Sequence, residues 1–237
     1  MRQWDDARIR AGMTRLLAQR RRMIDRGARP IGWKLGFGSP EGLRRMGITA
    51  PLAGHLTDLT LLPSGAIVDI SGWTRPVVEP EVAVYMDADL GSGANPTAVR
   101  KAIGSLGPAI ELADVDLDRL EVEPVLTRNI FHRQLILGTP DRARAGGRLA
   151  GLAARVLIDG QEVTRTSELE ALTGDLGAIV GELADVLAAS GERLRAGDVV
   201  ITGSVVPPIA GIAAEVSFEL SPFDPITVHL EMNPKEV

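Results

Sequence analysis

Hydrophobic residues recur at helical spacing in a few stretches of the chain. Residues 4–27 place Ile9, Met13, Leu16 and Leu17 on one helical stripe, and a glycine ends the segment. Residues 176–189 repeat this spacing before a second glycine stop. Two further helices are shorter, one beginning at Pro40 and one over residues 96–106. The pattern therefore predicts about four helices spread along the chain.

Short runs of β-branched and other apolar residues predict a larger number of strands. The predicted strands cover residues 30–36, 67–70, 77–86, 109–113, 130–137, 155–158, 199–204, 214–220 and 226–230. These strands cluster and do not alternate regularly with helices, which favours an α+β fold with a mixed or antiparallel sheet over a doubly wound fold. We expect an N-terminal helical segment, residues 1–30, followed by one domain, residues 31–237.

Composition narrows the class of protein. The 237 residues are 45% hydrophobic and 24% charged, which is typical of a folded globular chain. A net charge of −5 and an aromatic content of 3% predict binding to neither nucleic acid nor membrane. The absence of cysteine excludes disulfides, thiolate metal sites and a cysteine nucleophile. No apolar run is long enough to span a membrane, and the arginine-rich start lacks the apolar core typical of a signal peptide, so a cytoplasmic location is expected.

The segment RPVVEPEVAVYMDADL places two carboxylates on one predicted strand. Side chains two residues apart share a face, so Glu79 and Glu81 lie side by side among residues suited to burial. Like charges at this spacing repel, and burial raises the cost of each charge. Either Arg75 or Arg100 pairs with these acids, or one acid faces water, or the two acids hold a cation.

A third acid favours the cation. Glu111, in GPAIELAD, lies on a second apolar strand downstream of the first. Three carboxylates that converge from two strands require a divalent cation, and an all-oxygen ligand set is what Mg²⁺ or Mn²⁺ prefers. Zinc is disfavoured because cysteine is absent and histidine is scarce. Magnesium retains water in its coordination sphere, which leaves room for a substrate, so the predicted site is catalytic.

An ordered series of motifs gives these acids a family context. The segments GWKLG, GHLTD, EPEVAVYMDADL, PAIELAD, RNIFHRQLILG and LRAGDVVITGS follow one another from about residue 30 to the C-terminus. This series resembles the fumarylacetoacetate hydrolase superfamily, in particular its branch of 2-keto-4-pentenoate hydratases and 4-oxalocrotonate decarboxylases. The resemblance implies an α+β fold with a mixed, strongly bent β-sandwich or roll and a few peripheral helices. It also implies a divalent metal and a homo-oligomer, a dimer or larger.

The resemblance further implies roles for single residues. The acids Glu79, Glu81 and Glu111 match the metal-binding carboxylates of the family. Lys34 matches its active-site lysine, and Asp58 matches an acid near the pocket. The residues expected to line the same cavity are Asn129, Gly138, Thr202, Gly203 and Ser204.

The histidines are assigned from their surroundings. His55 is interpreted as a structural or pocket-lining group, and its alternative role is catalytic proton transfer, for which an imidazole pKa is suitable. His132 and His229 are interpreted as ordinary strand residues.

The expected chemistry uses a 2-oxo acid as the small-molecule partner. Its carboxylate and keto oxygens can chelate one metal ion, which then stabilises the enolate. We expect a hydratase that adds water to a 2-oxo-alkenoate of the 2-hydroxypenta-2,4-dienoate type, in the catabolism of aromatic compounds. Lys34 would hold the substrate carboxylate or move a proton, and Asp58 would activate water at the far carbon.

Three alternatives to the hydratase remain open. They are a 4-oxalocrotonate decarboxylase, an acylpyruvate-type C–C hydrolase and a non-catalytic partner subunit with the same fold. An oligomer surface is expected around Leu59, Leu61 and Leu62 and along residues 205–212, because these segments are apolar.

Overall fold

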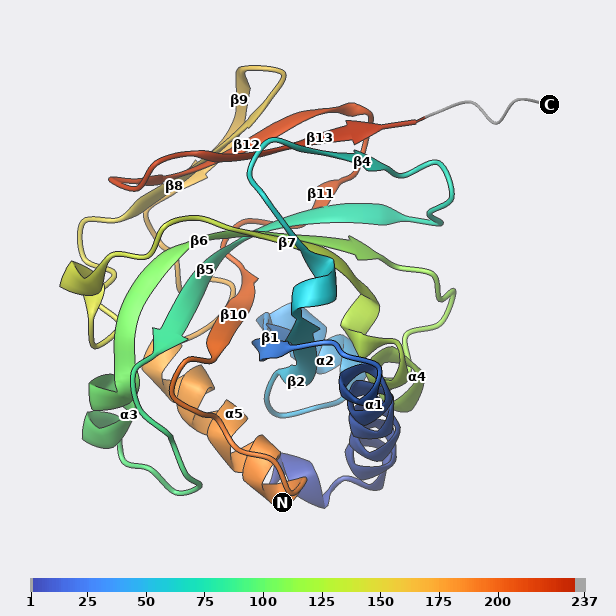
Figure 1. Cartoon of the computed structure of the whole chain (residues 1–237), viewed down its shortest axis with the longest axis vertical. Helices are drawn as coiled ribbons and strands as arrows, with labels where there is room; N and C mark the ends of the chain where they lie inside the picture. Colours follow the sequence, from blue (N-terminus) through green and yellow to red (C-terminus); the bar gives the residue numbers. More distant parts are fainter. Residues whose placement is uncertain (1, 233–237) are drawn as a thin grey trace.

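The computed structural model of the protein describes residues 2–232, which form two β-sheets and several helices (Figure 1). The α-helices are α1 (Ala7–Asp25), α2 (Pro40–Met46), α3 (Pro96–Ala102), α4 (Val122–Thr127) and α5 (Leu176–Ala189). The 3₁₀ turns are η1 (Gln3–Asp5), η2 (Asp58–Thr60), η3 (Asn129–Phe131) and η4 (Arg142–Arg144).

The larger sheet is mixed and strongly curled. Its strands are β1 (Pro30–Gly36), β2 (Leu52–Thr57), β3 (Leu61–Leu62), β5 (Pro76–Met86), β6 (Ile103–Asp114), β7 (His132–Leu137), β10 (Val199–Ser204) and β11 (Ile209–Ala210). They run in the order β2-β1-β10-β5-β6-β7-β3, with β11 paired to β5. The pairs β1–β10 and β3–β7 are parallel, and the other neighbours are antiparallel. Figure 1 shows this sheet bending into a half-barrel around the helices.

A second sheet covers the outer side of the curl, at the top of Figure 1. Its strands, in spatial order, are β4 (Ala66–Asp69), β13 (Ile226–Glu231), β12 (Ala214–Ser221), β8 (Ala153–Ile158) and β9 (Gln161–Thr166). Alternating residues of β12 and β8, among them Phe218 and Val156, are buried and join the main hydrophobic core. The α+β fold with a bent sandwich, expected from the sequence, is therefore confirmed.

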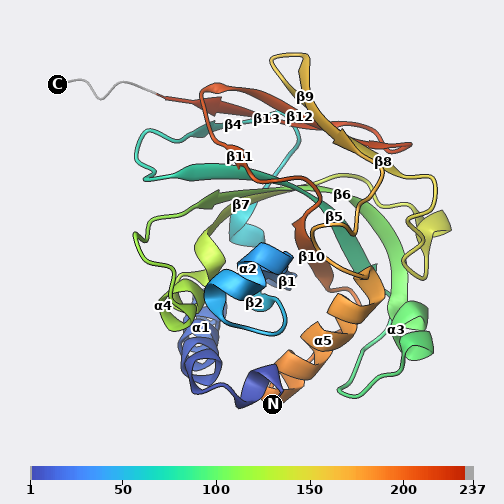
Figure 2. The same cartoon turned by 180° about the vertical axis from the view of Figure 1, so that it is seen from behind.

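The long helices close the open side of the half-barrel, as the two opposite views in Figures 1 and 2 show. The predicted stripe on α1 is buried in the same core as the sheets, and α1 packs against α4. Helix α5 begins at its Asp175 cap and spans the residues expected from its apolar spacing. The division of the chain at residue 30 stays a prediction, although α1 shares its core with the rest.

Some element boundaries differ from the prediction. Helix α3 ends at Ala102, not at residue 106, because residues 103–106 begin the fully buried strand β6. An apolar run of that kind has no periodicity that separates helix from strand. Strand β7 begins at His132, two residues later than expected, because Ile130 and Phe131 have positive φ angles of 52° and 65°. The sequence analysis gave no range for the strands β2, β3, β9 and β11 and missed the helix α4.

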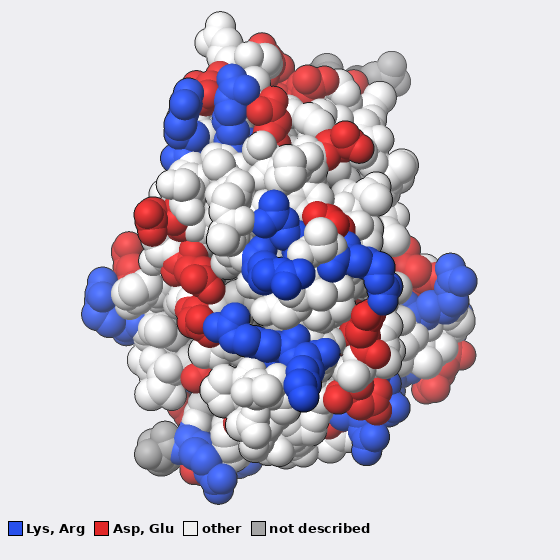
Figure 3. All heavy atoms as spheres, turned by 90° about the vertical axis from the view of Figure 1, so that its left-hand side faces the viewer, with Lys and Arg blue, Asp and Glu red and all other residues white. Residues whose placement is uncertain are grey.

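The surface carries charges of both signs. Figure 3 shows basic and acidic side chains adjoining one another on the face that it draws, and ion pairs such as Arg142–Asp87, 2.7 Å, recur along the chain. Leu59, Leu61 and Ile212 are exposed, as the predicted oligomer surface requires. Val205 and Val206 are buried inside the chain, so the expectation is wrong for these two residues. No helix within residues 2–232 combines the length and apolarity needed to cross a membrane.

Candidate metal centre and active site

The three acids singled out in the sequence meet at the middle of the large sheet. Glu79 on β5 lies directly opposite Glu111 on β6, and Glu81 follows two residues later on the same face of β5. One carboxylate oxygen from each acid lies within 4.8 Å of the other two. Glu81 and Glu111 are completely buried, and Glu79 is half-buried. The acids are thus close enough to share one cation.

Two buried oxygens of this cluster lack any partner within the described residues. Glu81 Oε2 accepts a hydrogen bond from the Gly203 amide at 2.6 Å, at a bulge where β10 departs from its pairing with β5. Glu81 Oε1 and Glu111 Oε2 have no hydrogen-bond partner. A buried carboxylate oxygen without a partner is costly. The donor set, all oxygen and acidic, fits a divalent cation such as Mg²⁺ or Mn²⁺.

The charges of the cluster support this reading. Burial, followed by the charge of Glu111, raises the pKa of Glu79 and raises that of Glu81 still further. Burial also acts to raise the pKa of Glu111, but Lys34 and His132 outweigh it, so the pKa of Glu111 is lowered. Without a cation, the ionised forms of Glu79 and Glu81 are therefore disfavoured at this site.

The arginines considered as partners for these acids bind elsewhere. Arg75 Nε donates to the Val115 carbonyl at 2.8 Å, and Arg100 lies 3.9 Å from Asp175. The hypothesis that one of these arginines neutralises Glu79 and Glu81 is therefore wrong.

Lys34 lies at the same centre. Its side chain is 1% exposed, and Nζ donates to Glu111 Oε1 and, at 3.1 Å, to the Ile130 carbonyl. On β2 the residue opposite Lys34 is Gly54, where a Cβ atom would come 2.8 Å from Lys34 Cγ. The glycine thus leaves the space in which the lysine stem lies, and the strand pairing directs the ammonium group to the acids.

A cavity of about 630 Å³ opens beside the acids. The predicted site residues that line it are Lys34, Glu79, Thr202, Gly203 and Ser204. The hydroxyls of Thr202 and Ser204 donate to backbone carbonyls of β5, at 3.1 and 3.3 Å, and so hold β10 beside the acids. Helix α2 contributes Glu41, Arg44 and Arg45 to the wall, three exposed residues that the sequence analysis did not select.

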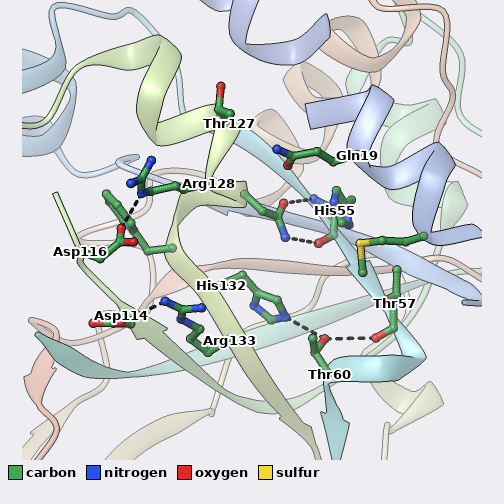
Figure 4. Close-up of a pocket in the computed structure, with 13 residues that line it drawn as sticks. Gln19, His55, Thr57, Thr60, Asp114, Asp116, Thr127, Arg128, His132 and Arg133 are labelled. Atoms are coloured by element: carbon green, nitrogen blue, oxygen red, sulfur yellow. Dashed lines mark hydrogen bonds and ion pairs between the residues drawn. The ribbon is translucent and has the colours of Figure 1, made fainter. Parts of the chain in front are cut away.

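A second, smaller cavity of about 270 Å³ lies between β2, η2 and the start of β7 (Figure 4). His55 and Asn129 line this cavity and not the larger one. The Asn129 side chain accepts from the His55 amide at 2.8 Å and donates to the His55 carbonyl at 2.9 Å. Burial, then the charges of Arg20 and His132, lower the pKa of His55 to about 4. His55 is thus neutral near pH 7, and Asn129 acts on the backbone.

Two other expected residues lie away from the acids. Asp58 accepts hydrogen bonds from the Arg29 amide and Arg29 Nε, each at 2.8 Å, and lines neither of the two cavities. Gly138 also lines neither cavity, and a Cβ atom there would come 2.6 Å from Pro108. The side chain of Asp58 therefore lies away from the cluster formed by Glu79, Glu81 and Glu111.

His132 is the residue that sequence reasoning missed. Its Nδ1 lies 2.7 Å from Glu111 Oε1, and its Nε2 lies 2.9 Å from Thr60 Oγ1. Figure 4 shows the ring pointing toward Thr60 within the smaller cavity. The interpretation of His132 as an ordinary strand residue is wrong, whereas His229 is a surface residue that lies 3.2 Å from Glu215. A polar ring on an apolar strand was the one available signal.

The sequence of this chain is similar to those of several known proteins. The model of the fumarylacetoacetate (FAA) hydrolase C-terminal family matches residues 46–233. A 4-oxalocrotonate decarboxylase of Pseudomonas putida is 29% identical over 222 residues, covering 90% of this chain and 78% of that protein. A 2-keto-4-pentenoate hydratase of Burkholderia vietnamiensis is 28% identical over 191 residues, covering 79% and 72%.

A solved structure shows the same fold. The 4-oxalocrotonate decarboxylase from Pseudomonas putida G7, complexed with magnesium and adipate, superposes with a TM-score of 0.83 at 24% identity, covering 91% of this chain and 83% of that chain. Because the family model spans most of the described sequence, including the strands that carry the three acids, this chain belongs to the fumarylacetoacetate hydrolase family, as the order of its motifs indicated.

Proposed function

We propose that this chain is a divalent-metal-dependent lyase that decarboxylates an unsaturated 2-oxo dicarboxylic acid. The observation that supports this most is the polarity of the larger cavity. Its buried part is lined by Lys34 and by Glu79, one of the three clustered acids, and its exposed wall carries Arg44 and Arg45. A substrate with a 2-oxo acid at one end and a carboxylate at the other is complementary to both parts.

The acid cluster would hold Mg²⁺ or Mn²⁺ through Glu79, Glu81 and Glu111. When bound, the cation supplies a Lewis acid that stabilises negative charge on a keto oxygen. Lys34 Nζ, held between Glu111 and the Ile130 carbonyl, supplies a fixed positive charge and hydrogen-bond donors beside that position. The Pseudomonas putida G7 structure, which carries magnesium and the dicarboxylate adipate, is consistent with this reading.

The far end of the substrate would meet α2. Neither Arg44 nor Arg45 has an ion-pair partner among the described residues, although both line the cavity. A guanidinium group forms a paired hydrogen bond with a carboxylate, so either arginine suits a second carboxylate. On decarboxylation the bond to that carboxylate breaks, CO₂ leaves, and the electron pair moves through the alkene to the keto oxygen. This step needs an electron sink and no base at the far carbon.

A hydratase acting on a monocarboxylic 2-oxo-alkenoate is the second candidate. Water addition needs an acid or base at the far carbon. Asp58, which we expected in that role, is bonded to Arg29 outside both cavities. Glu41 lines the larger cavity and could take the role, and the hydratase of Burkholderia vietnamiensis is a relative of similar identity. In both cases the enzyme would serve the breakdown of aromatic compounds through 2-oxo acid intermediates.

The two candidates separate when substrates are compared in parallel. The purified chain with Mg²⁺ should release CO₂ from 2-oxohex-3-enedioate faster than it hydrates 2-hydroxypenta-2,4-dienoate. An acylpyruvate tests the hydrolase. The double variant Arg44→Ala/Arg45→Ala should raise KM for the dicarboxylate about 10- to 100-fold, since a hydrogen bond to a charged group contributes about 1.5–3 kcal/mol. Arg26→Ala, an exposed arginine outside both cavities, is the matched control.

The outcomes are distinct. Rapid hydration without CO₂ release would replace the decarboxylase with the hydratase, and Glu41→Gln would then be expected to lower kcat. An unchanged KM in the double arginine variant would refute the role of α2. Metal binding with no turnover of any substrate would favour the non-catalytic subunit.

A further inference from the structure

The Glu111 carboxylate has two oxygens in different surroundings. Oε1 accepts a hydrogen bond from Lys34 Nζ and lies 2.7 Å from His132 Nδ1, whereas Oε2 has no hydrogen-bond partner among residues 2–232. Oxygens of Glu79 and Glu81 lie within 4.8 Å. A glutamate carboxylate rotates readily about its last bond, which would exchange the two oxygens. Two contacts on one oxygen oppose that rotation.

His132 is itself held from behind. Its Nε2 lies 2.9 Å from Thr60 Oγ1, and that hydroxyl donates to the Thr57 carbonyl at 3.1 Å. The ring is 2% exposed, so burying its two polar nitrogens is costly unless both are bonded. Both are bonded, one to Glu111 and one to Thr60. The chain of contacts thus runs from the backbone of β2, through η2 and β7, to the acid on β6.

The contact is not a by-product of core packing. On β7 the residues that fill the core are Leu135 and Ile136, which are fully buried and apolar. At the position of His132, paired with Ala113 across the sheet, an apolar side chain would fill the same space without any polar cost. The imidazole adds only its two hydrogen bonds, and one of them ends on the acid cluster.

We propose that His132 is a positioning residue for the metal centre. Its Nδ1, together with Lys34, fixes the Glu111 carboxylate so that Oε2 faces Glu79 and Glu81 and is ready for the cation. Thr60 fixes the ring in turn. The inference rests on the cation site of the proposed function but not on the reaction, because it concerns how a ligand oxygen is oriented before any substrate binds.

The test measures Mn²⁺ binding by calorimetry and by the electron paramagnetic resonance signal of bound Mn²⁺. Removing a group that orients a metal ligand typically costs about 10- to 100-fold in affinity. We expect a loss of that size in His132→Ala and in His132→Phe, which restores volume without a donor. His132→Asn, whose amide nitrogen can replace Nδ1, should recover most of the affinity and the signal of the wild-type site. His229→Ala, at a partly exposed histidine of the second sheet, far from the acid cluster, is the matched control.

Several results would overturn the proposal. The first is a wild-type affinity for Mn²⁺ in folded His132→Ala and His132→Phe. The second is a loss of Mn²⁺ affinity in His132→Asn that equals the loss in His132→Phe. Should His132→Ala not fold, Thr60→Val carries the test: it keeps the ring but removes its anchor, and an unchanged affinity would refute the proposal. Absence of Mn²⁺ binding in the wild type refutes it together with the proposed function. Normal Mn²⁺ binding without turnover removes only the function, and His132 is then judged on affinity alone.

Discussion

Replacement of Glu79 by glutamine should stabilise the metal-free protein at alkaline pH. The glutamine keeps the shape of the side chain but removes one of three clustered charges. Burial and the neighbouring Glu111 raise the pKa of Glu79 from its ordinary 4.5 to about 7. The difference corresponds to about 3 kcal/mol of unfavourable free energy once Glu79 is ionised.

The sign follows from the two states. Glu79 binds its proton more tightly in the folded protein than in the unfolded chain. The contribution of Glu79 to the stability of the metal-free wild type is therefore fully present below about pH 4.5 and is lost as the pH rises through about 7. In a chain of this size, 1 kcal/mol shifts the melting temperature by about 2–4 °C, so the gain in Glu79→Gln should be about 6–12 °C at pH 8 and small at pH 5.

Differential scanning calorimetry in EDTA at pH 5 and pH 8 measures this gain. Added Mg²⁺ should raise the melting temperature of the wild type and leave that of Glu79→Gln nearly unchanged. The difference in melting temperature between the two proteins should therefore shrink or change sign. Glu168→Gln, at an exposed acid outside the cluster, controls for the loss of one charge. Equal melting temperatures of wild type and Glu79→Gln in EDTA at pH 8 would refute the reasoning, because the acids would then carry no repulsion.

Three further outcomes are expected. Lys34→Ala should lower kcat by about 10²–10⁴ even at saturating Mn²⁺, and steady-state kinetics with near-normal turnover would contradict its role. Asn129→Ala removes two hydrogen bonds to the His55 backbone and should lower the free energy of unfolding in urea by about 2 kcal/mol. An unchanged urea midpoint would show that these two hydrogen bonds do not stabilise the fold. Light scattering should give a mass above the 25.2 kDa of one chain, and Leu59→Glu, at an exposed leucine, should lower it; a monomeric wild type would exclude the oligomer.

The parts of the fold that local pattern governs were predictable. The apolar spacing of residues 176–189 reproduces α5, and the alternation along residues 77–86 places Glu79 and Glu81 on one face of β5. By contrast, β2 is buried at every position, so no alternation marks it as a strand. Helix α4 has only six residues, too few for a periodic signal.

The residues of the candidate site also fall into those that local sequence could assign and those that it could not. Glu111 could be assigned because it lies on an apolar strand, where a lone acid requires a partner. His132 reaches Glu111 only through the register of β6 and β7 and a segment with positive φ angles at Asn129, Ile130 and Phe131, none of which is glycine. Local sequence carries no signal for such a backbone. Asp58 was misplaced because its partner, Arg29, is 29 residues away and becomes a neighbour only in the folded chain.

The direct pairing of Glu79 with Glu111 also affects how the chain folds. β5 and β6 pair at the middle of the large sheet, so the half-barrel is complete only when these two strands are joined. Like charges opposite each other on paired strands oppose that step. A cation that binds as the strands meet would remove the opposition, so we expect assembly of the sheet to depend on metal supply. Stopped-flow refolding at pH 8 should accordingly be faster in Mg²⁺ than in EDTA, and equal rates would show that the strands pair before the acids approach.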